Sequence, residues 1–150
     1  MRALVQRVSY AKVEVSGDTV GEIGPGLLVF LGVTETDSET EARYLAQKIS
    51  KLRIFNDDAG KMNLSVKDIG GGALAVSQFT LYADAKKGNR PSYVHAAPPD
   101  HADPLFERFK ALLADTGLTV ASGVFAADMK VSLLNDGPVT IWLDTAELVA

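Results

Sequence analysis

The sequence predicts an α+β fold with a curved, largely antiparallel β-sheet, a barrel-like core and two main helices. Alternating apolar and polar residues dominate both ends of the chain, which is typical of half-buried strands. Helical periodicity is limited to two internal segments, and the order of elements matches neither a repeated strand–helix unit nor an all-strand protein. The 150 residues suffice for one core but not for two ordinary ones, so residues 1–150 are expected to form a single domain.

The N-terminal third is expected to be mostly strand. Residues 3–8, 11–15 and 19–23 have the alternation of half-buried strands, with a turn at Gly17 between the second and the third. The apolar run of residues 27–31 has no alternation, and such a run suits a strand that is buried on both faces.

Two helices are expected. Ser38 and Glu41 form a capping-box pattern at the start of the first, and apolar residues follow at helical spacing at Ala42, Leu45, Ile49 and Leu52. The second is expected to start at Asp103, with Pro104 in its first turn, and to end at Gly117. Its predicted buried stripe consists of Leu105, Phe109 and Leu112.

The remaining segments carry the less regular patterns. Residues 73–82 read as a strand, and residues 83–101, which contain three prolines, are expected to form an ordered but irregular loop. Two further strands, at about residues 128–134 and 139–143, are expected to flank a turn at Asn135-Asp136-Gly137-Pro138.

Composition limits the class of protein. The chain has no cysteine, so it can form neither a disulfide framework nor a thiolate metal site. No apolar run approaches the roughly 20 residues of a membrane span, and we expect a cytoplasmic protein with no membrane partner. The net charge of -4 argues against a broad nucleic-acid interface. The local basic cluster is Lys86, Lys87 and Arg90, for which a solvated loop is the simplest interpretation.

The usual catalytic patterns are missing. His95 and His101 both fall in the proline-rich region, and no spacing pairs either of them with a nucleophile. A histidine folded back onto Ser77 or Thr80, a zinc site with a carboxylate, and exposed histidines without a catalytic role all remain possible. No glycine-rich phosphate loop or HExxH motif is present, and we expect neither a metal nor a cofactor.

Polar residues interrupt the predicted strand of residues 73–82 at Ser77, Gln78 and Thr80. Because side chains alternate along a strand, Ser77 and Thr80 share a site only at a bulge or at the strand end, where backbone N–H groups also become free. The alternative is a strand that simply runs out to the surface.

Two segments together resemble the signature motifs of the D-aminoacyl-tRNA deacylases. They are Ser77-Gln78-Phe79-Thr80-Leu81-Tyr82 and Asn135-Asp136-Gly137-Pro138-Val139-Thr140, in the order and at about the separation found in that family. The opening segment through Val8, the Gly24-Pro25-Gly26-Leu27 turn, Lys51-Leu52-Arg53-Ile54-Phe55 and Asn89-Arg90-Pro91-Ser92-Tyr93 are similar as well. Neither motif departs from the family pattern, and the resemblance covers nearly the whole chain.

The resemblance implies a homodimeric carboxylic ester hydrolase that removes D-amino acids from the acceptor end of tRNA, with no role for DNA. Its implied catalytic residues are Ser77, Gln78, Phe79 and Thr80. Gly137 and Pro138 are implied to form a cis dipeptide that enters the partner's active site, held by Arg7. Met129 matches a family position that packs on the terminal adenine, and the RNA itself is implied to assist catalysis.

Selection between enantiomers requires geometry, because D- and L-amino acids carry the same groups. A rigid backbone wall where an L side chain would project admits D-amino acids, and it also admits glycine, so glycyl-tRNA is an expected second substrate. Lys86, Lys87 and Arg90 are the expected phosphate contacts. Two other interpretations stay open: a hydrolase with Thr80 as a true nucleophile, and a noncatalytic RNA-binding module.

Overall fold

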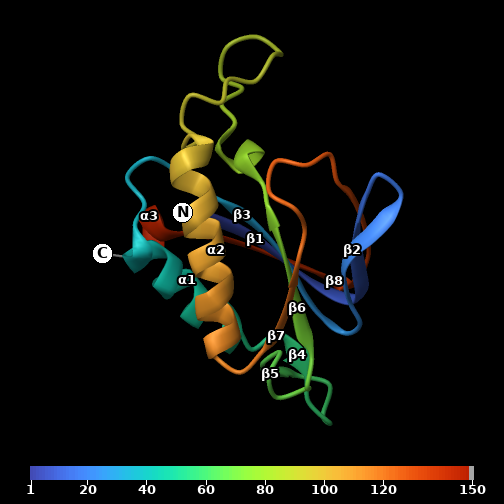
Figure 1. Cartoon of the computed structure of the whole chain (residues 1–150). Coiled ribbons are helices and arrows are strands. Elements are labelled where there is room, and N and C mark those ends of the chain that lie inside the picture. The colour runs from blue at the N-terminus through green and yellow to red at the C-terminus, as the bar shows by residue number, and fades with distance from the viewer. Residues whose placement is uncertain (149–150) are drawn as a thin grey trace.

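The computed structural model describes residues 1–148, which form a curved mixed sheet with a helical layer against one face (Figure 1). The strands are β1 (Arg2–Val15), β2 (Asp18–Ile23), β3 (Gly26–Gly32), β4 (Phe55–Asn56), β5 (Met62–Leu64), β6 (Gly72–Ser77), β7 (Thr119–Ser122) and β8 (Lys130–Asp144). The helices are α1 (Glu39–Lys51), the 3-10 helix η1 (Phe79–Tyr82), α2 (Pro99–Asp115) and α3 (Thr145–Leu148).

Strand β1 organises the sheet. It pairs antiparallel with β2, β3 and β8, whereas β3–β6 and β6–β7 are parallel. The main sheet runs in the order β2-β1-β3-β6-β7, with β8 also on β1, and β4 and β5 form a separate small sheet. The predicted α+β class with a curved, barrel-like sheet is therefore confirmed.

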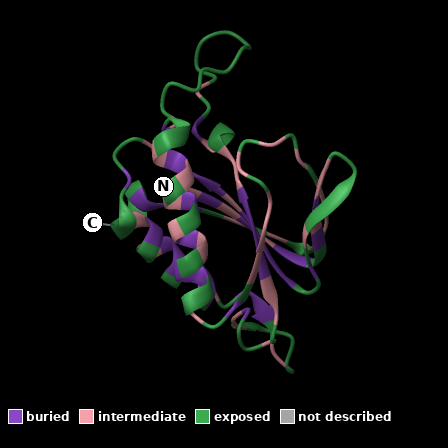
Figure 2. Ribbon diagram, viewed as in Figure 1, coloured by how far each residue is buried: buried purple, intermediate pink, exposed green. Residues whose placement is uncertain are grey.

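Apolar side chains fill both faces of the central strands. One cluster lies between the sheet and helices α1 and α2, whose buried faces turn toward the sheet in Figure 2. A second cluster lies on the opposite face, among β1, β2, β3, β6 and β8. In β3, Leu27 and Val29 belong to the first cluster and Leu28 to the second, so the prediction of a strand buried on both faces is confirmed.

The first helix begins as predicted, with both hydrogen bonds of the Ser38–Glu41 capping box. The prediction for the second helix was wrong at its start. Helix α2 begins at Pro99 rather than Asp103, because Pro98 is extended and the first helical turn tolerates a residue without an N–H. Its buried residues are Ala102, Phe106, Phe109, Leu112 and Leu113, and Leu105 is only half-buried.

Two strand predictions were also wrong. The strand expected over residues 73–82 ends at Ser77, and the chain continues as a 3-10 helix. The two strands expected around the Asn135 turn are parts of one long strand, β8, and both parts pair with β1. Strands β4, β5 and β7 were not predicted, because segments this short show no recognisable alternation.

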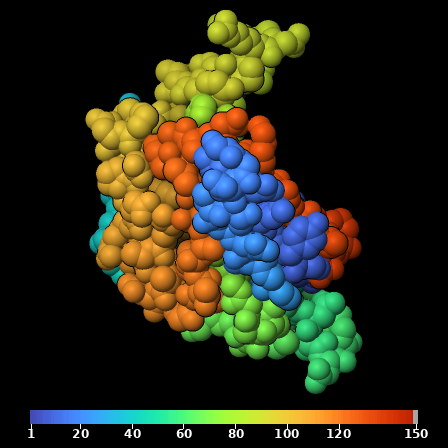
Figure 3. All heavy atoms as spheres, turned by 45° about the vertical axis from the view of Figure 1, so that its right-hand side comes forward, coloured from blue at the N-terminus to red at the C-terminus, as the bar shows by residue number. Residues whose placement is uncertain are grey.

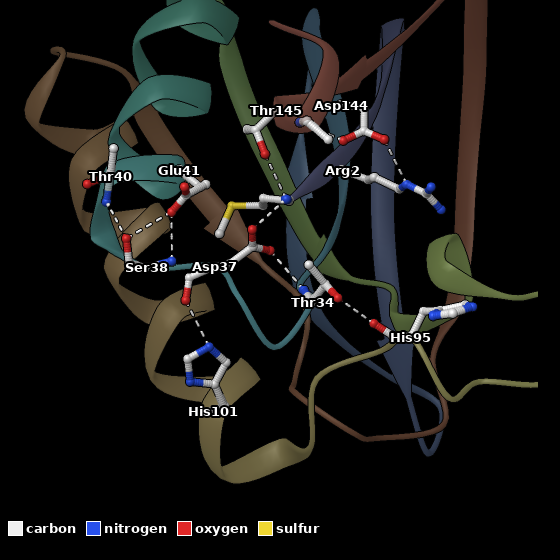
Figure 4. A network of polar contacts seen from close by, with 12 residues as sticks. Arg2, Thr34, Asp37, Ser38, Thr40, Glu41, His95, His101, Asp144 and Thr145 are labelled. Carbon is white, nitrogen blue, oxygen red and sulfur yellow. Dashed lines mark hydrogen bonds and ion pairs between the residues drawn. The ribbon is translucent and has the colours of Figure 1, made fainter. Parts of the chain in front are cut away.

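A buried polar network joins the start of β1 and the end of β8 to the loop before α1 and to α2 (Figure 4). The amino group of Met1 donates to Asp37 Oδ1 at 2.7 Å and to Thr145 Oγ1 at 2.8 Å. Asp37 Oδ2 accepts from the Thr34 amide at 2.8 Å, and the Asp37 carbonyl lies 2.9 Å from His101 Nε2. Since a buried ammonium group requires such partners, the network fixes the start of β1 against the loop before α1. Over residues 1–148, no helix is both long and apolar enough to span a membrane.

Candidate active site

A pocket of about 590 Å³ opens at the end of the central strands. Its walls come from the ends of β3 and β6, the first residue of η1, the start of α2 and the loop between β7 and β8, which arches beside η1 in Figure 1. The polar residues on the wall are Ser77, Gln78 and Asp128, and most of the others are apolar or aromatic. A pocket with mainly apolar walls and a few polar groups is typical of a small-molecule or base-binding site.

The sheet ends at the wall of this pocket. Ser77 is the last residue of β6 and pairs with Leu31, and the Gln78 amide still donates to the Leu31 carbonyl at 2.8 Å. The chain then turns into η1. The first N–H groups of a helical turn have no acceptor within the turn, so the amides of Phe79 and Thr80 are available where β6 ends.

The structure brings Ser77, Gln78 and Phe79 together on the pocket wall. Thr80 is not part of that wall. Its side chain is exposed and its Oγ1 accepts from Gln78 Nε2 at 2.5 Å. Ser77 and Gln78 are half-buried, whereas Phe79 is exposed at the mouth.

Met129 and Phe125 lie on the wall formed by the β7–β8 loop. Met129 is half-buried and packs over Gly123: a Cβ added to Gly123 would lie 2.5 Å from Met129 Sδ. Because glycine has no side chain, position 123 leaves room for the side chain of Met129.

The Gly137-Pro138 segment forms an outward loop within β8. Gln6 pairs with Thr140 and Val8 with Asn135, so residues 136–139 lie opposite Arg7 alone. The peptide bond between Gly137 and Pro138 is cis. Because both flanks of the loop pair with the same strand, it is an interruption of β8 and not the reversal expected between two strands.

Arg7 and Asn135 hold this loop. The Arg7 guanidinium is buried, and it donates from Nε to the Asp136 carbonyl at 3.0 Å and from Nη1 to the Ile54 carbonyl at 2.7 Å. Asn135 Nδ2 donates to the carbonyls of Arg7 and Val139, each at 3.0 Å. These bonds satisfy the polar groups that the interrupted ladder leaves unpaired.

The loop leaves no room for a side chain at Gly137. Its φ is +124°, and an added Cβ would lie 2.6 Å from Arg7 Nη2 and 2.9 Å from Val139 Cγ2. Glycine adopts this backbone region without the clash that a Cβ causes. The loop can therefore keep this conformation only with glycine at position 137.

The loop and the pocket occupy different places in one chain. Ser77 pairs with Leu31, and Leu31 pairs in turn with Ala3 of β1. The loop instead lies opposite Arg7 of β1, which is about 13 Å from Ala3 along the strand at the usual rise per residue. Gly137 and Pro138 are exposed, and within the described part of the chain neither is among the residues that line the pocket.

The basic cluster Lys86, Lys87 and Arg90 lies on the loop between η1 and α2, which stands clear of the body in Figures 1 and 3. All three side chains are exposed and none lines the pocket. The loop closes through paired backbone bonds between Asp84 and Ser92, at 2.7 and 2.8 Å. The Lys86 amide donates to Asp84 Oδ1 at 2.9 Å and holds the pKa of that carboxyl below its usual value.

Neither histidine is on the pocket wall. His95 lies 3.5 Å from Asp84 Oδ2 and is largely exposed, and His101 lies on α2 against the Asp37 carbonyl. Among residues 1–148 there is no group of three or more side chains suited to holding a metal ion. The described pocket therefore offers backbone amides, the Ser77 hydroxyl, the Gln78 side-chain amide and the exposed carboxylate of Asp128, which pairs with Lys130, but no histidine base.

Sequence reasoning missed three residues of this region. Asn135 clamps the loop, Phe125 lines the pocket, and Tyr93 reaches the pocket mouth from the loop between η1 and α2. Asn135 and Tyr93 were within segments singled out by sequence, but their roles depend on contacts that no local pattern records.

Comparison with known proteins identifies a family to which the chain is similar. The family described as D-Tyr-tRNA(Tyr) deacylase matches residues 4–144. A D-aminoacyl-tRNA deacylase of Geobacter sulfurreducens is 59% identical over 145 residues, covering 97% of this chain and 95% of the relative. One of Chromobacterium violaceum is 62% identical over 146 residues, covering 97% of each chain.

Two solved structures are also similar. One, a c-Myc DNA Unwinding Element Binding Protein, has a TM-score of 0.90 and 40% identity, with 96% of this chain and 98% of that chain covered. The other is described as a probable eukaryotic D-amino acid tRNA deacylase and has a TM-score of 0.80 at 17% identity, covering 95% and 97%. At that identity the second likeness shows a shared fold only.

Proposed function

The chain belongs to the D-Tyr-tRNA(Tyr) deacylase family, whose reaction is the hydrolysis of D-aminoacyl-tRNA, and we propose that it positions the ester while the RNA assists its hydrolysis. The observation that carries this proposal is the pocket at the end of β6. It combines Ser77, Gln78 and Phe79 with apolar walls and has no histidine among its described lining residues. Turnover of D-tyrosyl-tRNA by the purified protein is the direct test, and no release of D-tyrosine would contradict it.

The reaction requires a water molecule to attack the ester carbonyl and the ribose oxygen to leave with a proton. In the proposed mechanism the ribose hydroxyl beside the ester assists the attack, so the protein supplies no base. The amides of Phe79 and Thr80 stabilise the negative charge that develops on the carbonyl oxygen. Ser77 and Gln78 hold the ester in place, and Met129 packs on the terminal adenine. Holding the reacting groups in position supplies much of the rate gain in such reactions.

We propose that the active unit is a symmetric dimer in which each Gly137-Pro138 loop enters the partner's pocket. The exposure of the loop, away from the pocket of its own chain, supports this arrangement. Exposed apolar side chains nearby support it further, since Tyr10 pairs with Leu134 across β1 and β8 and they are 47% and 46% exposed. A two-fold arrangement would cover both copies of this surface and complete two sites.

Chiral selection follows from a wall of main-chain atoms. The buried Arg7 fixes the loop, and backbone atoms have no rotamers with which to admit the wrong enantiomer. An L side chain would collide with the wall, whereas a D side chain points away from it. Glycine has no side chain, so glycyl-tRNA passes the same filter. We also propose that the reaction takes place in the cytoplasm, where aminoacyl-tRNA is used in translation.

The phosphates of the acceptor end are proposed to contact Lys86, Lys87 and Arg90. These three cations lie on a loop that projects beside the pocket, in a protein whose net charge is -4. Three neighbouring cations give this loop a local positive charge, so it is proposed to carry the main electrostatic part of tRNA binding.

The first prediction concerns Thr80. We expect Thr80→Ala to retain D-tyrosyl-tRNA hydrolysis to within about tenfold, because Thr80 supports Gln78 and supplies an amide but is not the attacking group. Single-turnover rates measure the effect, and Thr36→Ala, an exposed threonine outside the pocket, is the matched control. A loss above about 10³-fold, or an acyl group trapped on Thr80, would establish a nucleophile instead.

The second prediction concerns the proposed main-chain filter at Gly137. Gly137→Ala should displace the loop, since its Cβ would lie 2.6 Å from Arg7 Nη2. We expect the ratio of D- to L-tyrosyl-tRNA hydrolysis to fall by at least about tenfold, which corresponds to a loss of about 1.4 kcal/mol in discrimination. Gly60→Ala is the control, because Gly60 also has a positive φ, +79°, but nothing within 4 Å of the added Cβ. An unchanged ratio in Gly137→Ala would contradict the backbone filter.

The third prediction concerns the phosphates. Replacing Lys86, Lys87 and Arg90 together by glutamine should weaken tRNA binding and reduce the slope of log affinity against log salt by about two. The matched control replaces Arg43, Lys48 and Lys51 on α1, which removes the same charge from an exposed helix face. Equal slopes in the two triple variants would mean that phosphates bind elsewhere.

A further inference from the structure

Two exposed aromatic rings meet at the mouth of the pocket. Phe79 and Tyr93 are 53% and 43% exposed, and their ring centroids lie 4.9 Å apart at an interplanar angle of 73°. Both residues belong to the pocket wall. An edge-to-face pair fixes the orientation of both rings and leaves ring surface open to solvent.

The chain around Tyr93 is ordered before any ligand binds. The Tyr93 carbonyl accepts from the Ala96 amide at 3.1 Å, and the neighbouring His95 carbonyl accepts from Thr34 Oγ1 at 2.6 Å. On the other side, the paired backbone bonds of Ser92 and Asp84 close the loop. Tyr93 is therefore presented by a turn that is anchored on both sides, so binding at its ring requires little further ordering.

The arrangement of aromatic and cationic groups indicates what binds there. Tyr93 directly follows Ser92, whose backbone pair with Asp84 closes the projecting loop, and Lys86, Lys87 and Arg90 lie within the closed segment. A chain that leaves the pocket over Tyr93 meets exposed cations next. Aromatic rings followed by cations are the pattern with which proteins bind single-stranded nucleic acid, since bases stack on the rings while phosphates pair with the cations.

We propose that Tyr93, held by Phe79, stacks on the base of the nucleotide that precedes the terminal adenosine of tRNA. The inference rests on the proposed function and adds a positioning residue to it. Tyr93 lies at the mouth, on the loop side, whereas Met129 is half-buried on the β7–β8 side of the pocket. The two residues thus contact successive bases of the single-stranded CCA end. Stacking there fixes the direction in which the ester enters the pocket.

Kinetics with a full and a truncated substrate test this role. For D-tyrosyl-tRNA, we expect Tyr93→Ala to raise KM about tenfold with kcat within about twofold, because stacking contributes to binding before chemistry. For D-tyrosyl-adenosine, which lacks the preceding nucleotide, the same variant should match the unaltered protein. Tyr93→Phe keeps the ring and should restore KM, and Val94→Ala, which trims a neighbour that is 73% exposed, should have no effect. An equal loss on both substrates would overturn the proposal.

A binding measurement keeps the proposal separate from the proposed function. An uncharged RNA minihelix with 2-aminopurine before its terminal adenosine should lose fluorescence on binding to the protein and to Tyr93→Phe, but not to Tyr93→Ala at saturation. If the unaltered protein shows this quenching yet hydrolyses no D-aminoacyl ester, the proposed function fails and the stacking proposal stands. If Tyr93→Ala quenches as strongly as the unaltered protein, the stacking proposal fails whatever the activity.

Discussion

The buried guanidinium of Arg7 is the contact on which the arrangement of β8 depends. It lies in the middle of β1, and its N–H groups donate to the carbonyls of Ile54 and Asp136. A buried cation without such acceptors is costly, so the side chain needs both segments in place. The long strand β8 pairs with β1 on each side of this point and loops out only where Arg7 faces it. Arg7, together with Asn135, thus holds a loop that ordinary strand pairing would not form.

This constraint gives the loop the property that the proposed filter requires. Arg7 binds the Asp136 carbonyl, Asn135 binds the Val139 carbonyl, and the close approach at Gly137 leaves little room for the loop to shift. The pocket is built by different means, from a strand end, a 3-10 turn and the β7–β8 loop. Because loop and pocket lie at different levels of β1, one chain holds both parts without joining them. In the proposed dimer, a second copy completes the site.

Features that depend on neighbouring residues were predictable from the sequence. The Ser38 capping box and the burial of strand β3 on both faces follow from local rules. Features that depend on pairing between distant segments were not. Local periodicity at Asn135 reads as a turn between two strands, because it contains no information that both flanks pair with β1. The end of β6 at Ser77 is similar, since the apolar residues after it support η1 as well as a strand.

The residues of the candidate site also fall into those that a local motif predicts and those that only the tertiary structure brings together. One short motif contains Ser77, Gln78 and Phe79, and the structure places all three on the same pocket wall. Tyr93 and Phe125 reach the same pocket from separate loops, and only the tertiary structure brings them there. The separation of Gly137 from the pocket within one chain could be found only from the register of four strands, β1, β3, β6 and β8.

Subunit complementation tests most directly whether the site is shared between two copies. The pocket variant is Ala96→Trp, whose larger side chain is designed to fill the pocket. The loop variant is Gly137→Ala, which is designed to displace the Gly137-Pro138 loop. Each is purified alone, and the two are then unfolded together and refolded as a mixture. A shared site predicts that about half of the dimers are mixed and hold one intact site of two, which restores about a quarter of the unaltered protein's D-selective activity. If the mixture shows only the average activity and selectivity of its two parents, or if the unaltered protein is a fully active monomer, the shared site is contradicted.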